Sequence, residues 1–224
     1  MRLSLLFSGL LFSVLLFSVA AACWAQTQRD SHHHGSRSPE EWVKILENPD
    51  RDAWQKPDEV IEKLGLAQGA AVADIGAGSG YFSVRLARAV GPQGTVFAAD
   101  IDEGLIEYLV KRSAQEGLHN LKPLLGRPDD PLLPPASVDL VFICDVIHHI
   151  EDRGPYYSKL ARALRPGGRL VIVDFYKREL PVGPPPAMKI AKTDLIAELG
   201  QAGFGLREEF DLLPYQYFLI FETK

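Results

Sequence analysis

Three alternating glycines follow an apolar run that carries a carboxylate, and this spacing can hold a small ligand against bare backbone. The segment is Val72–Phe82, in which Asp74 stands two positions before Gly76, and Gly78 and Gly80 follow. Such a turn lets a ligand approach closely and leaves free N–H groups beside it. A carboxylate at Asp74 favours a ligand that carries an ammonium or a sulfonium over a pyrophosphate.

The glycine spacing differs from the dinucleotide-binding fingerprint, G-x-G-x-x-G. If Gly76 and Gly78 are its first two glycines, the third falls at position 81, which is Tyr81. An NAD-linked oxidoreductase is therefore the weaker interpretation of this segment.

At these residues the chain resembles the class I S-adenosylmethionine-dependent methyltransferases, whose first motif is this acid followed by glycines. Leu164–Gly168, which reads Leu-Arg-Pro-Gly-Gly before an apolar strand, is a second mark of the family. The resemblance extends from about Trp42 to the C-terminus. It implies S-adenosylmethionine as the cofactor and in-line transfer of its methyl group to an acceptor, with Asp74 ordering the turn and the methionine ammonium.

Asp100 is the candidate for the ribose of this cofactor. It ends the second apolar run, 24 positions after Gly76, and one carboxylate can accept hydrogen bonds from both ribose hydroxyls. Asp102 is better placed to cap the next helix; Ile101 would lie against the adenine and Tyr81 over the methionine part. The cofactor-binding residues that we predict are Asp74, Gly76, Ala77, Gly78, Gly80, Tyr81, Asp100, Ile101, Asp129 and Asp130.

Asp129 and Asp130 enter this set through the resemblance alone. The family usually carries an acid after the third strand that contacts the adenine amino group, but Arg127 occupies its usual position. Either aspartate can take that role, and an aspartate-rich turn explains the pair equally well. The resemblance also places Trp54 or Gln55 against the cofactor, with a turn packed by a tryptophan as the alternative.

Asp145, His148 and His149 follow the fourth apolar run and are the candidates for catalysis. An acidic acceptor needs a general base, and histidine titrates near neutral pH. Only one of two adjacent histidines at helical spacing can face the cleft, and we favour His149; a structural or capping histidine is the alternative. Asp174 and Tyr176, at the end of the fifth run, can line the acceptor pocket.

The elements that must position these residues alternate between strand and helix after residue 65. The pattern predicts an α/β fold: a Rossmann-like, seven-stranded, mostly parallel sheet with helices on both faces and an antiparallel C-terminal hairpin. Strands are expected near 71–75, 95–99, 122–125, 138–145, 169–175, 206–212 and 217–222, and helices near 40–47, 57–64, 81–90, 103–116, 156–164 and 193–202. Leu164–Gly168 is expected as a helix stop and turn.

Composition fits one globular domain with an extension. The chain has 224 residues, of which 46% are hydrophobic, and a net charge of −5. No strongly basic stretch is present to pair with phosphates, which argues against a nucleic-acid partner. Cys144 is the only cysteine beyond residue 23, so no disulfide can form within the domain.

Residues 1–25 have the outline of a secretory signal peptide. Arg2 precedes an uncharged run, Leu3–Ala22, and small residues lead to a cleavage position after Ala25. An uncleaved signal anchor and a lipoprotein at Cys23 are the alternatives. Each places the domain outside the cytoplasm, periplasmic or extracytoplasmic, with membrane contact only through this segment. Residues 26–39 predict a flexible linker containing His32–His34, and residues 40–224 the methyltransferase domain.

Short loops without a large insertion favour a small-molecule acceptor. Export complicates this interpretation, because S-adenosylmethionine is made in the cytoplasm. A non-catalytic cofactor-binding or sensing protein that retains the fold is therefore the alternative, and an aminopropyl transferase is another. The oligomeric state is left open by the sequence.

Overall fold

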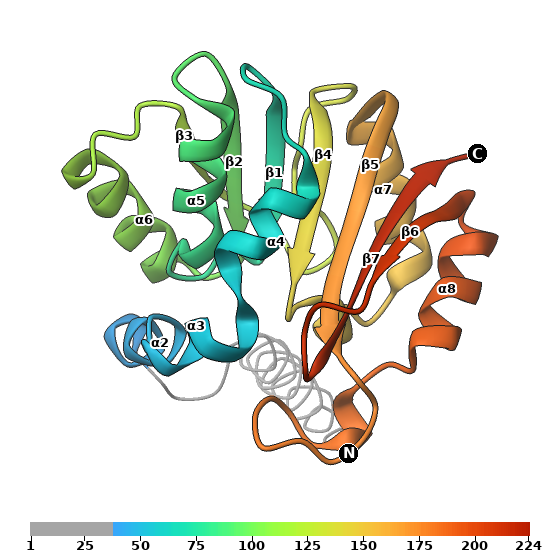
Figure 1. The fold of residues 1–224 in the computed structure, drawn as a ribbon. Helices are drawn as coiled ribbons and strands as arrows, with labels where there is room; N and C mark the ends of the chain where they lie inside the picture. Colours follow the sequence, from blue (N-terminus) through green and yellow to red (C-terminus); the bar gives the residue numbers. More distant parts are fainter. Residues whose placement is uncertain (1–37) are drawn as a thin grey trace, which may run out of the picture. The chain divides into compact units, whose positions relative to one another are not determined.

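The computed structural model describes residues 38–224, which form one seven-stranded sheet with helices packed against it (Figure 1). The strand order is β3-β2-β1-β4-β5-β7-β6. The strands are β1 (Ala71–Ile75), β2 (Thr95–Asp100), β3 (Leu121–Leu125), β4 (Val138–Cys144), β5 (Leu164–Phe175), β6 (Phe204–Phe210) and β7 (Gln216–Thr223). The predicted leader and nearly all of the predicted linker lie outside the described residues.

The pairing of the strands confirms the predicted fold class. β1 pairs in parallel with β2 and β4, and β2–β3 and β4–β5 continue the parallel part of the sheet. β7 is antiparallel to both β5 and β6, so the C-terminal hairpin forms one edge. The order reverses around β1 and β4, and ligands of open α/β sheets bind beyond the strand ends at such a point.

Seven α-helices are present in the part of the chain that the structure describes. They are α2 (Pro39–Leu46), α3 (Asp50–Gln55), α4 (Pro57–Leu64), α5 (Tyr81–Val90), α6 (Glu103–Gln115), α7 (Arg153–Ala163) and α8 (Lys192–Gln201). No helix among these residues is both long and apolar enough to cross a membrane.

Two hydrophobic cores lie on opposite faces of the sheet because side chains alternate along each strand. In β5, Ile172 belongs to the core that includes side chains of α7 and α8, whereas Val173 belongs to the core that includes side chains of α4, α5 and α6. Asp174 therefore continues the face of Ile172, and this places its carboxylate on the α7–α8 side at the carboxyl end of the sheet.

Helix α3 was not expected from the sequence. Asn48-Pro49-Asp50 predicts a stop, but proline also suits the start of a helix, since the first N–H groups need no intrahelical partner. Asn48 Oδ1 accepts the N–H of Asp50 at 3.0 Å, and the chain turns into a second helix. The same property of proline explains why α7 begins at Arg153, before Pro155, rather than at residue 156.

The predicted turn at Leu164–Gly168 is instead part of β5. Leu164 pairs with Val138, and the register then shifts so that Arg169 pairs with Leu140. Gly167 has a φ of 77°, which glycine adopts without strain. The segment is therefore an irregularity at the start of the strand, whereas the predicted helix stop is confirmed, since α7 ends at Ala163.

Candidate active site

The three glycines adopt the backbone conformation that their spacing indicated. Gly76, Gly78 and Gly80 have φ values of 70°, 56° and 87°, a region that other residues rarely adopt. The N–H groups of Gly76 and Ala77 donate to the carbonyl of Ala99 at 2.8 and 3.0 Å. The turn between β1 and α5 is therefore fixed against the end of β2.

Asp100 is hydrogen-bonded to this turn. Its Oδ2 accepts the N–H of Gly78 at 2.7 Å, and its Oδ1 accepts the N–H of Asp102 at 3.0 Å. Asp102 in turn accepts the N–H of Leu105 at 3.0 Å, which confirms it as the N-cap of α6. Asp100 therefore ties the end of β2 to the glycine turn, and its contact with a ribose stays a prediction. Ile101 is 37% exposed beside it.

Asp74 is buried below the turn. Its Oδ2 accepts a hydrogen bond from the Ser83 hydroxyl at 2.5 Å, which joins β1 to α5. Burial raises the pKa of Asp74 to about 7; the Ser83 hydrogen bond opposes this rise and the negative charge of Asp100 adds to it. The carboxyl group thus titrates near neutral pH.

The segment before the domain core packs onto the glycine turn. Glu47 Oε1 accepts hydrogen bonds from the Ser79 hydroxyl at 2.5 Å and from Arg112 Nη1 at 2.6 Å. A Cβ atom at Gly78 would lie 2.8 Å from Leu46 Cδ1, and one at Gly76 would lie 2.2 Å from Val146. The end of α2 and the residue after Asp145 therefore both border the turn.

Tyr81 connects α5 to α3. Its hydroxyl donates to Asp52 Oδ1 at 2.5 Å, and its ring lies 4.1 Å from the guanidinium carbon of Arg51 and 4.4 Å from that of Arg85. Burial, together with the hydrogen bond to Asp52, raises the pKa of the Tyr81 hydroxyl well above its usual value. Contact between Tyr81 and the cofactor stays a prediction.

A closed ring of hydrogen bonds holds α3 against the ends of β4 and β7. Arg51 Nη2 lies 3.3 Å from Asp145 Oδ2, and Arg51 also donates to Gln55 Oε1 at 3.3 Å. Gln55 Nε2 donates to Gln216 Oε1 at 2.6 Å, and Gln216 Nε2 donates back to Asp145. Burial raises the pKa of Asp145 to about 6, while Arg51 opposes the rise.

The sequence did not single out Arg51 or Gln216, which complete this ring. Gln55 is fully buried although it is polar, and buried polar side chains are as a rule hydrogen-bonded. Trp54 packs elsewhere, with its ring 5.8 Å from that of Phe175 and 6.2 Å from that of Tyr215. The one feature of the sequence that could have indicated this ring is Gln55, a polar residue on the face of α3 that is buried.

His148 and Asp174 form a buried pair at the ends of β4 and β5. His148 Nδ1 lies 2.9 Å from both carboxylate oxygens of Asp174, and the two side chains are 2% and 1% exposed. The N–H of Phe175 donates to Asp174 Oδ1 at 2.7 Å and fixes the carboxylate further. His149 is exposed, with its ring centroid 4.2 Å from that of His148. The hydrogen bonds therefore point to His148, whereas the sequence favoured His149.

Asp129 and Asp130 lie in a turn beyond β3. Lys159 Nζ donates to the Asp129 carbonyl at 2.5 Å and lies 3.2 Å from its carboxylate, and this lysine lowers the pKa of Asp129. Asp130 Oδ1 accepts the N–H of Leu132 at 2.8 Å. These contacts describe an aspartate-rich turn, and the adenine contact stays a prediction. Among residues 38–224 no cluster of three metal-ligating side chains occurs.

Comparison with known proteins decides the family. The family model described as a methyltransferase domain matches residues 66–202, more than half of the chain. The chain belongs to this family. A class I methyltransferase uses S-adenosylmethionine, and the sulfonium cofactor that the resemblance implied is thereby confirmed.

Several relatives of this methyltransferase domain are enzymes of quinone biosynthesis. It is 31% identical over 123 residues to the ubiquinone/menaquinone biosynthesis C-methyltransferase of Hahella chejuensis, a match that covers 54% of this chain and 49% of that protein. It is 27% identical over 121 residues to the demethylmenaquinone methyltransferase of Geobacillus stearothermophilus, covering 54% and 51%. The chain thus spans about half the length of the curated relatives it matches.

Solved structures agree with the fold. A SAM-dependent methyltransferase from Aquifex aeolicus has a TM-score of 0.78 and 27% identity, covering 83% of this chain and 98% of that one. The cyclase SpnF has a TM-score of 0.62 at 20% identity, covering 70% and 59%, and this likeness concerns the fold alone.

The residues of the turn suit the cofactor chemically. Gly76 and Gly78 expose backbone rather than side chains in the turn, whose Cβ positions are already bordered by Val146 and Leu46, and Asp100 supplies a carboxylate at its edge. Asp74 supplies a carboxylate below the same turn. The contacts of Asp74 and Asp100 with the cofactor ammonium and ribose stay predictions.

Proposed function

We propose that the domain transfers a methyl group from S-adenosylmethionine to a small-molecule acceptor, with His148 as the general base and Asp174 as its positioning residue. The observation that carries this proposal is the buried His148–Asp174 pair at the carboxyl end of the sheet. That edge also carries the glycine turn, so the base and the cofactor residues share one end of neighbouring strands.

The cofactor would be held by the residues predicted from the sequence. Asp100 would accept from the ribose hydroxyls, Ile101 would cover the adenine, and the backbone from Gly76 to Gly80 would approach the methionine part. When bound, S-adenosylmethionine supplies an activated methyl group on a sulfonium, so the protein contributes mainly position.

His148 is suited to take a proton from the acceptor. If its Nδ1–H donates to Asp174, its Nε2 lone pair is free to accept a proton from a hydroxyl, and the carboxylate then stabilises the imidazolium. Asp145 directly follows β4 and is already engaged by Arg51 and Gln216. We therefore assign Asp145 to holding α3 in place rather than to proton transfer.

The named activity of the relatives supports a hydroxylated aromatic acceptor. Those proteins are C-methyltransferases of quinone biosynthesis, and removing the proton of a ring hydroxyl increases the nucleophilicity of the ring. Hydroquinones and phenols are the first compounds to screen. The family match does not favour the alternative of a non-catalytic sensor.

Calorimetric titration of the full chain with S-adenosylmethionine, S-adenosylhomocysteine and NAD tests the cofactor site. We expect micromolar binding of the first two, no binding of NAD, and a loss of about 10- to 100-fold for Asp100→Ala, because charge-assisted hydrogen bonds disappear. Asp102→Ala is the matched control, since it removes a neighbouring carboxylate that only caps α6. Absence of binding for both sulfur compounds would refute the proposal.

We also propose that residues 1–25 export the protein, from the charge and apolar pattern of the sequence. Mass spectrometry of the mature N-terminus after expression in a Gram-negative host tests this. A mature chain that begins at Gln26, or at a lipidated Cys23, is the expected result. An intact Met1 on cytoplasmic protein would refute export.

A further inference from the structure

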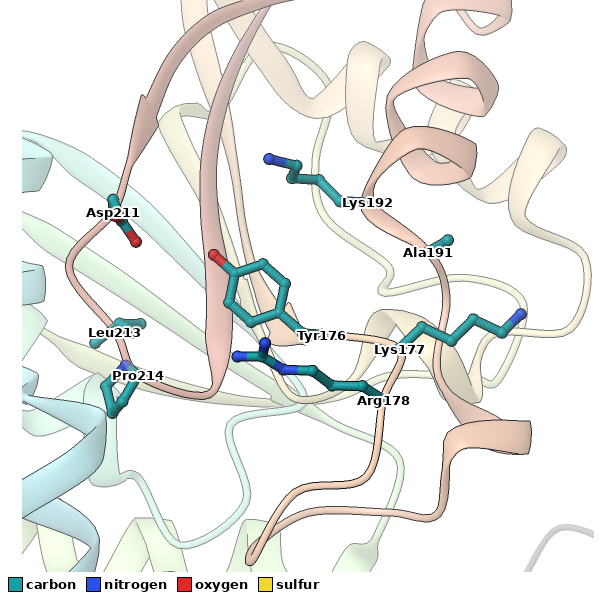
Figure 2. A pocket seen from close by; sticks show the side chains of 8 residues that line it. All are labelled: Tyr176, Lys177, Arg178, Ala191, Lys192, Asp211, Leu213 and Pro214. Atoms are coloured by element: carbon teal, nitrogen blue, oxygen red, sulfur yellow. The ribbon is translucent and has the colours of Figure 1, made fainter.

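A hollow lies beyond the end of β5, between the β6–β7 connection and the start of α8 (Figure 2). Its volume is about 490 Å³, which falls in the range of small-molecule sites. The lining residues that matter here are Tyr176, Arg178, Lys192, Asp211, Leu213 and Pro214.

Arg178 carries a positive charge that nothing in residues 38–224 neutralises. Its guanidinium carbon lies 5.2 Å from the centroid of the Tyr176 ring, and its side chain makes no ion pair or hydrogen bond within this range. Figure 2 shows the guanidinium turned under the Tyr176 ring toward Pro214, whereas the Lys177 side chain points away. A planar guanidinium held on an aromatic face offers a carboxylate two parallel N–H donors.

A buried ammonium supports the backbone of Arg178. Lys189 is 3% exposed, and its Nζ donates to the Arg178 carbonyl at 2.8 Å and lies 5.7 Å from the centroid of the Phe175 ring. No carboxylate of the described residues lies within ion-pair distance of it. Lys189 is thus a buried positive charge behind Arg178, and buried charges are usually paired. Together with the exposed Arg178 guanidinium on the hollow itself, it makes this wall favour an anionic group.

The opposite wall limits the charge of that ligand. Lys192 is paired with Glu209, whereas Asp211 makes no ion pair or hydrogen bond in the described part of the chain. Figure 2 shows the Asp211 carboxylate turned toward the Tyr176 hydroxyl. A dianionic phosphate would be repelled there more strongly than a single carboxylate. Leu213 and Pro214 add an apolar surface for the body of the molecule.

Tyr176, which lines the hollow, lies on the same face of the sheet as the His148–Asp174 pair. Asp174 and Tyr176 are two residues apart, and Tyr176 still donates its N–H to the Tyr215 carbonyl at 3.0 Å. Two residues of extended chain span about 6.6 Å, and side chains at this spacing point to the same face. A molecule anchored on Arg178 would therefore extend toward His148.

We propose that this hollow binds the carboxylate of an organic monocarboxylate with an apolar body, and that this molecule is the methyl acceptor. The second part rests on the proposed function; the anion site itself does not. The carboxylate would pair with Arg178, and its apolar body would lie along Leu213 and Pro214.

The test is an NMR titration of the full chain at low ionic strength with benzoate, benzamide and phenyl phosphate as probes. We expect saturable binding of benzoate, at least about 10-fold weaker binding of neutral benzamide, and weaker binding of phenyl phosphate. Arg178→Ala should weaken benzoate binding at least about 10-fold. Lys177→Ala removes the same charge at the rim of the hollow, but its side chain points away from Tyr176 and Pro214, so it should change benzoate binding less than about 2-fold. Asp211→Asn should tighten phenyl phosphate relative to benzoate.

If Arg178→Ala and Lys177→Ala weaken benzoate binding equally, the attraction is general to positive charge and the proposed site is wrong. The site is also wrong if benzamide binds as tightly as benzoate. If the NMR shifts do not saturate by about 10 mM benzoate, the Kd is too weak for a specific site, and the proposal is wrong. Titration of the same samples with S-adenosylmethionine separates this inference from the proposed function. If S-adenosylmethionine does not bind but benzoate does, the proposed cofactor site is wrong and the anion site is still supported.

Discussion

At the scale of single residues, the neighbours of His148 and His149 distinguish two side chains that the sequence cannot separate. His148 is buried against Asp174, and His149 is exposed. A general base must be held in one tautomer and one orientation, and a carboxylate on the far ring nitrogen does both. The structure therefore moves the catalytic hypothesis from His149 to His148.

Substitution of these residues tests the assignment. His148→Gln should lower kcat by about 10²- to 10⁴-fold, and Asp174→Asn by a similar factor, since general-base catalysis contributes about this much. His149→Gln is the matched control and should change kcat less than about 3-fold. The measurement is steady-state kinetics with the first acceptor that turns over, alongside calorimetry to check that cofactor affinity is kept. A control variant as damaging as His148→Gln would contradict the assignment.

At the scale of elements, α3 is a short helix whose stability must come from tertiary contacts. Six residues are too few to be helical alone. The ring formed by Arg51, Gln55, Asp145 and Gln216 satisfies buried polar groups of three elements at once. Because the end of α2 borders the glycine turn, this ring also stabilises the segment that would lie over the cofactor.

Gln55→Ala should destabilise the domain by about 2 kcal/mol, because it leaves the buried Gln216 Oε1 without its donor and removes one acceptor of Arg51. Amide hydrogens of α3 should exchange faster, while those of β1 should lose less protection. Gln201→Ala, at an exposed position in α8, is the control and should stay within about 0.5 kcal/mol. Denaturant unfolding and hydrogen exchange measure both effects. Equal stability of the two variants would show that the ring contributes nothing.

At the scale of the whole molecule, buried carboxyl groups make stability depend on pH. The pKa of Asp74 is raised from 3.8 to about 7, so the folded protein binds this proton more tightly than the unfolded chain does. Its contribution to the free energy of unfolding is therefore largest below pH 4 and is lost as the pH rises toward 7. Asp145, raised to about 6, adds a change of the same sign over a narrower range.

Asp74→Asn should remove much of this dependence while keeping an oxygen that accepts the Ser83 hydroxyl. We expect the variant to be more stable than the natural chain at pH 8 by an amount on the order of 1–3 kcal/mol, with a smaller difference at pH 5. Asp58→Asn, whose side chain is 94% exposed, should leave the pH profile unchanged. Urea unfolding from pH 5 to pH 8 measures the free energy of unfolding of each variant. If Asp74→Asn changes this free energy equally at every pH, the effect does not come from ionisation of Asp74.

Local patterns in the sequence were enough to predict the fold and, through the family resemblance, the cofactor class. Apolar strands, glycine spacing and helix caps act over a few neighbouring residues, so Asp74, Gly76–Gly80 and the N-cap at Asp102 could be recognised from local pattern. The alternation of strands and helices then fixed a mostly parallel sheet, because few connections are sterically allowed. The short helix α3 was not predicted, since it depends on partners more than 85 residues away, at the end of β4 and in β7.

Which side chains contact one another became known from the packed structure. His148 meets Asp174 across 26 residues of sequence, and Arg51 meets Asp145 across 94. The hollow around Arg178 is likewise assembled from β5, α8 and the β6–β7 connection. Hydrogen bonds and ion pairs of this kind depend on distances of a few ångströms between strand ends. Such distances arise only when distant segments pack, so they cannot be predicted from local sequence patterns.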